Sequence, residues 1–224
     1  MDNRLSYNLP YIKVEFKYEK ESKYRNIISE EEVIEYNENF YSRYKSDIII
    51  KTNKSECVVD NKFFFEKDNT YTFTIFFKKQ PTTLKGIFYT NEGLRAVLDV
   101  SMNLLPIFSM ESSFEECVNL ENIEGLSHLN VAHVRTFNSC FCKCYKLCDI
   151  SPINNWVNDV ATDFSFMFYH CNILDQSSIL KLIQNLNNNI NSDNIFETSD
   201  EYSDTERSAE WIIMNLPRKI IYCE

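Results

Sequence analysis

The sequence predicts an α+β protein: a β-rich module, a short solenoid of about four repeat units, and a helical cap. Three observations lead to this fold class. Apolar and charged residues alternate early in the chain, a 27-residue repeat follows, and an amphipathic segment comes after the repeat. We assign residues 1–85 to the module, 86–176 to the solenoid and 177–224 to the cap. A chain of 224 residues is long enough to bury a core of this extent.

The N-terminal module is predicted from changes in hydrophobic period. Residues 11–19 read YIKVEFKYE, in which apolar and charged side chains alternate as in a half-buried strand. Over residues 29–46 the period becomes helical, and Ser29 with Glu32 three residues later forms a capping box. Turn residues then separate three more predicted strands, at 47–52, 62–67 and 71–79.

The repeat becomes visible when the chain is written in rows of 27 residues from position 107. Three apolar columns then align without a gap: Phe114, Phe141 and Phe168; Cys117, Cys144 and Cys171; and Leu120, Leu147 and Leu174. A degenerate earlier row, residues 94–103, fits at an offset of 26. A period of this length is typical of solenoids, in which each unit covers the apolar face of its neighbour.

The repeat rows SSFEECVNLENIEGL, SCFCKCYKLCDISPI and FSFMFYHCNIL resemble the BspA-like leucine-rich repeat family, over about residues 94–176. The resemblance implies a leucine-rich-repeat solenoid that recognises proteins or surfaces and does not catalyse a reaction. The chain departs from the family in having few units and no export signal. It also carries Pro152 and Trp156 where the family has small polar turn residues. We therefore carry over the fold and not the surface location.

The stretch CFCKCYKLC, residues 140–148, holds four of the eight cysteines. Cys144 belongs to the apolar column, and Cys140 lies beside the column phenylalanine, so both are expected in the core. Cys142 and Cys148 fall in polar columns and are expected to be exposed. We interpret the stretch as a consequence of the repeat, because C-x-C-x-C spacing does not supply paired zinc knuckles. A metal site, or a redox switch through Cys142 and Cys148, remains the alternative.

Composition and charge argue against several classes of function. A net charge of −10 disfavours binding to nucleic acid or to anionic membranes. With three glycines and three histidines, the chain shows no glycine-rich phosphate loop, no G-x-S-x-G and no H-E-x-x-H motif. We expect no enzyme activity, no catalytic residue, and neither a cofactor nor a metal. The N-terminus lacks the apolar region of a secretion signal, which predicts a cytoplasmic protein with reduced cysteines.

The C-terminal region is predicted to close the solenoid. Residues 177–190 follow a serine cap and place five apolar side chains on one helical face: Ile179, Leu182, Ile183, Leu186 and Ile190. A helix here would cover the apolar end of the last repeat. Residues 192–206 are polar and acidic and are expected to form a mobile loop, and 211–222 to form a final strand or helix.

These features predict a non-enzymatic protein that binds a protein partner through the exposed strand face of the repeats. Side chains beside the buried columns would form that face: Asn119, Glu121, Asn122, Glu124, Lys146, Cys148, Asp149 and Ser151. The alternative functions are a surface adhesin or antigen of the BspA-like type, and a cysteine-based metal or redox sensor.

Overall fold

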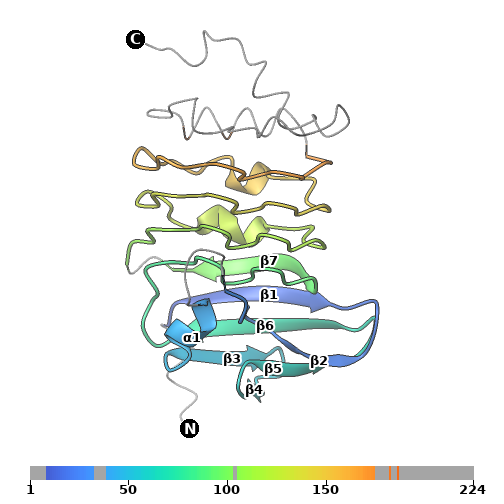
Figure 1. Ribbon diagram of the computed structural model, residues 1–224. Coiled ribbons are helices and arrows are strands. Elements are labelled where there is room, and N and C mark those ends of the chain that lie inside the picture. The colour runs from blue at the N-terminus through green and yellow to red at the C-terminus, as the bar shows by residue number, and fades with distance from the viewer. Residues whose placement is uncertain (1–8, 33–38, 103–104, 175–181, 183–185, 187–224) are drawn as a thin grey trace, which may run out of the picture.

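The structure is a computed structural model that describes residues 9–32, 39–102, 105–174, 182 and 186. Its regular elements are almost all strands, arranged in two antiparallel sheets (Figure 1). The larger sheet has the order β4-β3-β6-β1-β7, and the smaller pairs β2 with β5. The strand bounds are β1 Tyr11–Lys17, β2 Lys23–Asn26, β3 Ile48–Thr52, β4 Cys57–Val58, β5 Lys62–Phe65, β6 Thr70–Phe77 and β7 Leu94–Ser101. The helical elements are short: α1 Phe40–Tyr44 and the 3-10 turns η1 Glu124–His128 and η2 Ser151–Ile153.

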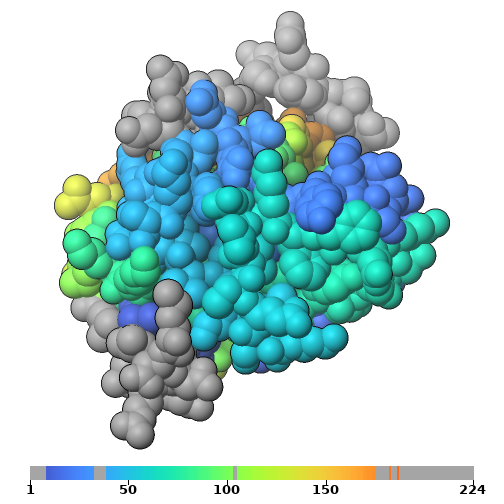
Figure 2. Space-filling model, turned by 90° about the horizontal axis from the view of Figure 1, so that it is seen from below, coloured from blue at the N-terminus to red at the C-terminus, as the bar shows by residue number. Residues whose placement is uncertain are grey.

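Strand β1 is at the centre of the main sheet, between β6 and β7. The alternation predicted for this segment is confirmed, since Ile12, Val14 and Phe16 are at most 2% exposed. Their neighbours Lys13 and Glu15 are more accessible. The N-terminal strands form one end of the molecule, which Figure 2 shows from below as blue and cyan atoms.

Among the described residues of the range 29–46, the predicted helix is much shorter in the structure. It comprises only Phe40–Tyr44, and Asn39 caps it by accepting a hydrogen bond from the Ser42 N–H at 2.8 Å. Ser29 does not cap a helix: its Oγ accepts from the Glu31 N–H at 3.1 Å, its own N–H donates to the carbonyl of Ile87 at 2.9 Å, and residues 30–32 are not helical. Asn61 binds both the N–H and the carbonyl of Ile28, so this backbone is held by long-range partners. Residues 33–38 lie outside the described part of the chain.

Beyond β7, the 27-residue rows lie one on another and continue the sheet (Figure 1). One edge of β7 pairs with β1. At its other edge the Val97 N–H donates to the Asn122 carbonyl at 2.8 Å, and Ala96 and Asn122 form a parallel bridge. We refer to residues 81–106, 107–133, 134–160 and 161–174 as rows 0 to 3.

Backbone hydrogen bonds join each row to the next at equivalent positions. Phe88 N–H donates to Ser113 O at 3.0 Å, Phe114 N–H to Cys140 O at 2.9 Å, and Phe141 N–H to Met167 O at 2.9 Å. Each row also contains two residues with left-handed φ: Gly86 and Thr90, Ser112 and Glu116, Ser139 and Lys143, and Phe166 and His170. A left-handed residue interrupts an extended strand, so the rows contain isolated bridges and tight turns.

The predicted fold class is therefore wrong. The described residues form two antiparallel sheets with one five-residue helix, and they contain neither a closed solenoid nor a helical C-terminal cap. The 27-residue period identified which side chains meet between rows. It carried no information on the backbone within a row, where paired left-handed residues prevent regular strands and helices. Of the predicted cap only Leu182 and Leu186 are described, and both are buried. The predicted acidic loop and final element lie outside the described residues.

Phenylalanine rings form the centre of the rows. The rings of Phe114 and Phe141 stack with centroids 5.2 Å apart and planes 4° from parallel, and Phe141 and Phe168 stack at 5.5 Å and 2°. Phe88 continues the column toward the sheet, 5.7 Å from Phe114, and lies 6.4 Å from Phe16 of β1. One hydrophobic cluster thus runs from the sheet through all the described rows.

Candidate functional site

The column cysteines make the same hydrogen bond in each row. The Sγ–H groups of Cys117, Cys144 and Cys171 donate to the carbonyls of the column phenylalanines one row earlier, which are Phe88, Phe114 and Phe141. The three S···O distances are 3.1, 3.1 and 3.0 Å. Burial raises the pKa of each of these thiols, so the proton that makes the bond is retained at neutral pH. Cysteine here is a small core residue that also links two rows.

The other cysteines of CFCKCYKLC only partly match expectation. Cys140 is fully buried and Cys148 is exposed, as predicted, but Cys142 is only 4% exposed, and the prediction of exposure was wrong. Burial, with a smaller contribution from the carboxylate of Glu115, raises the pKa of Cys142 to about 12. Within the described residues, no three His, Cys, Asp or Glu side chains form a group suited to a metal ion.

The eight residues predicted to bind a partner lie in rows 1 and 2 and are here called the acidic face. Glu121, Asn122, Glu124, Cys148, Asp149 and Ser151 are exposed, and Asn119 and Lys146 are partly buried. The two rows repeat one turn: Asn122 Oδ1 accepts from the Glu124 N–H at 2.7 Å, and Asp149 Oδ1 from the Ser151 N–H at 2.8 Å. These turns lead into η1 and η2, which contact each other.

Glu121 is the electrostatic centre of the acidic face. Its carboxylate lies 3.1 Å from Arg95 Nη1 and 3.5 Å from Lys146 Nζ. Arg95 is only 8% exposed, and its Nη2 also lies 2.9 Å from Glu19, beyond the end of β1. The buried guanidinium thus holds Glu121 in place and ties the acidic face to the N-terminal sheet.

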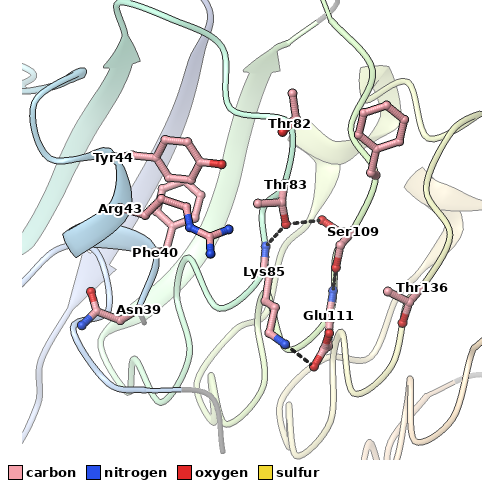
Figure 3. Close-up of a pocket in the computed structure, with 11 residues that line it drawn as sticks. Asn39, Phe40, Arg43, Tyr44, Thr82, Thr83, Lys85, Ser109, Glu111 and Thr136 are labelled. Carbon is pink, nitrogen blue, oxygen red and sulfur yellow. Dashed lines mark hydrogen bonds and ion pairs between the residues drawn. The ribbon is translucent and has the colours of Figure 1, made fainter. Parts of the chain in front are cut away.

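A groove of about 410 Å³ lies between α1 and the residues of rows 0 to 2 that face it (Figure 3). Arg43 and Tyr44 of α1 point across it toward Thr83 and Lys85 of row 0. Phe108 lines the row side, where its ring lies 5.5 Å from the Arg135 guanidinium. The structure brings these residues together although α1 and the rows are far apart in the sequence.

The row side of the groove carries hydroxyl side chains at equivalent positions. Thr83, Ser109 and Thr136 each accept a hydrogen bond from the N–H two residues later, at 3.1 to 3.2 Å. Ser109 also forms a parallel bridge to Thr136. The sequence did not predict this site. The hydroxyl column was visible at spacings of 26 and 27, but nothing in the sequence places α1 opposite it.

None of the helices in the described part of the chain is long and apolar enough to span a membrane. Comparison with known proteins found no curated protein and no solved structure that matches the chain. A family model described as "Mycoplasma protein of unknown function, DUF285" matches residues 82–211. The match begins at Thr82, whose carbonyl accepts an inter-row hydrogen bond from the Phe108 N–H, and it spans rows 0 to 3. Because it covers more than half of the 224 residues, the chain belongs to this DUF285 family of proteins of unknown function.

Proposed function

We propose that this protein is a non-enzymatic interaction module that binds a basic protein partner through the acidic face. The observation that carries the proposal is the position of Glu121, held by Arg95 and Lys146 beside the exposed carboxylates of Glu124 and Asp149. Side chains fixed before binding lose little conformational entropy when a partner docks. The fixed position of Glu121 therefore favours specific recognition.

The charge balance supports a basic partner. The face carries three carboxylates and one lysine, on a chain whose net charge is −10. Complementary charge increases the rate of encounter and orients the partner, and it makes the association sensitive to salt. We therefore expect the partner to present lysine or arginine side chains.

The state of the buried thiols argues against cysteine-based catalysis. Burial raises the pKa of Cys117, Cys140, Cys144 and Cys171, which disfavours the thiolate that a nucleophile or a metal ligand requires. The raised pKa of Cys142 likewise makes it a poor redox partner for Cys148.

A surface adhesin is the second candidate, because the repeat rows resemble the BspA-like family. Such a protein would recognise its partner outside the cell, and it would bind that partner through the same acidic face. Fractionation of the native host's cells, with detection by an antibody to this chain, separates the two. Recovery in the membrane or surface fraction supports the adhesin, and recovery in the cytosol supports the intracellular module.

Charge changes on the acidic face test the proposal. We combine Glu124→Lys with Asp149→Asn, which retains an oxygen to accept from the Ser151 N–H. The matched control combines Glu56→Lys with Glu32→Gln, which makes the same change in net charge at exposed positions off the face. Proteins captured from host extract by the wild type and the control, and lost with the face variant, support the proposal. Equal capture by all three contradicts it.

A further inference from the structure

The groove between α1 and the rows has a lining that suggests its ligand. We infer that it binds a carbohydrate, a neutral oligosaccharide, at a site separate from the acidic face. Its lining combines three aromatic rings, four hydroxyl side chains, one amide and three charged side chains, and it includes no Leu, Ile, Val or Met. A sugar ring has an apolar C–H face edged by hydroxyl groups, and this mixture of rings and hydrogen-bonding groups matches both.

The lining does not suit a peptide. A helical peptide would need a groove of aliphatic side chains for its apolar face, and this lining has none. An extended peptide would need free backbone groups to pair with. On the row side, backbone groups already pair between rows: Leu84 N–H donates to Ser109 O at 2.9 Å and Met110 N–H to Thr136 O at 3.1 Å.

The groove lining holds two cations, Arg43 and Lys85, and one carboxylate, Glu111, and Lys85 and Glu111 pair with each other. Lys85 Nζ lies 2.6 Å from Glu111 Oε1, and both side chains are about one-fifth exposed. This pair neutralises the lysine within the groove. A paired lysine and carboxylate can still donate to and accept from the hydroxyl groups of a neutral ligand.

The aromatic side chains supply a surface for stacking. Phe108 is 39% exposed, and the Arg135 guanidinium, 5.5 Å from its ring centre, restrains the ring. Across the groove, the ring of Tyr44 lies 4.8 Å from that of Phe40, which is anchored in the core. Thr82 is exposed beside Phe108, and its backbone carbonyl accepts from the Phe108 N–H at 2.8 Å. Thr82 and Phe108 both line the groove.

The test uses the full chain and an array of defined neutral and acidic oligosaccharides, with isothermal titration of the best binder. Two groove variants are measured, Phe108→Ala and the isosteric Thr82→Val. The control is Tyr24→Ala, which removes a ring that is 67% exposed on β2, away from the groove. We expect a neutral oligosaccharide to bind, and each groove variant to weaken binding by about tenfold. Tyr24→Ala should bind like the wild type.

Folding of the variants is checked by their melting temperatures, and Thr82→Val at an exposed site keeps the test decisive if Phe108→Ala is unstable. Failure of every oligosaccharide to bind would overturn the inference. So would binding that both groove variants retain, or competition by inorganic phosphate or by an extended peptide. Because the acidic face is unchanged in these variants, capture of protein partners is unaffected whichever result is obtained.

Discussion

The thiol of Cys144 donates a hydrogen bond to the carbonyl of Phe114 across 3.1 Å, from one row to the previous one. The same carbonyl also accepts the Cys117 N–H within its own row, at 3.1 Å. One oxygen therefore closes a turn and joins two rows. The relationship recurs between Cys171 and Phe141, so the Phe-x-x-Cys spacing of the repeat has a direct structural basis.

Truncation of a column phenylalanine should destabilise the protein strongly. Phe141 is fully buried between Phe114 and Phe168. We expect Phe141→Ala to lower the free energy of unfolding by roughly 3 to 5 kcal/mol, measured by urea denaturation. Tyr145→Ala, at a neighbouring exposed ring, should change it by less than about 0.5 kcal/mol. Equal stability of the Phe141 variant and the wild type would contradict the stacked core.

The cysteine column predicts a graded effect. Cys144→Ala removes a buried sulfur and its hydrogen bond, but the Phe114 carbonyl keeps its backbone donor. We expect a loss of about 1 to 3 kcal/mol in unfolding free energy. Cys148→Ala, at an exposed position of the same stretch, should be close to neutral. A larger loss of unfolding free energy for Cys148→Ala than for Cys144→Ala would contradict the assignment of Cys144 to the core.

The left-handed turns predict a stabilising substitution. Ser139 has φ 52°, which costs a non-glycine residue about 1 to 2 kcal/mol, and glycine avoids this cost. After the entropy that glycine loses on folding, Ser139→Gly should stabilise by about 0.5 to 1 kcal/mol. The adjacent Asn138→Gly, where φ is not left-handed, should destabilise instead. Thermal melts of the two variants give opposite shifts if the turn is as described.

The buried thiols predict a loss of stability at alkaline pH. The pKa of Cys142 rises from its ordinary value of 9.0 to about 12 in the folded state, so the folded chain holds this proton longer than the unfolded chain does. Its contribution is complete below pH 9 and is lost between about pH 9 and 12, by up to about 1.4 kcal/mol per pH unit. Melting temperatures measured across that range should fall, and they should fall less steeply for Cys142→Ser. Parallel curves for the two proteins would argue against the burial of this thiol.

Chelation should leave the fold unchanged. The column thiols retain their protons and donate them to carbonyl oxygens, whereas a structural zinc site requires thiolates that converge on one point. We expect the same circular dichroism and melting curve before and after a strong chelator under reducing conditions. Loss of zinc together with secondary structure would show that CFCKCYKLC binds a metal.

Much of the core was predictable because it depends on local period. Alternation placed Ile12, Val14 and Phe16 on one buried face, and the 27-residue spacing brought Phe114 over Phe141. The burial of Cys142 was not predictable in this way. Its column contains Glu115 and Tyr169, and its own low exposure depends on how the turns of adjacent rows cover it.

The sequence by itself determined which residues repeat, which strands alternate and where charge accumulates, because these properties depend on spacing along the chain. Only the tertiary structure decided that the rows contain bridges and left-handed turns, that α1 begins at Phe40, and that Arg95 joins Glu19 to Glu121. The groove between α1 and the rows, which Ser109 lines, was likewise decided only by the tertiary structure. For the bridges, the Arg95 ion pairs and the groove the physical reason is sequence separation: these contacts join residues tens of positions apart, and no local period records which distant segment will supply the partner.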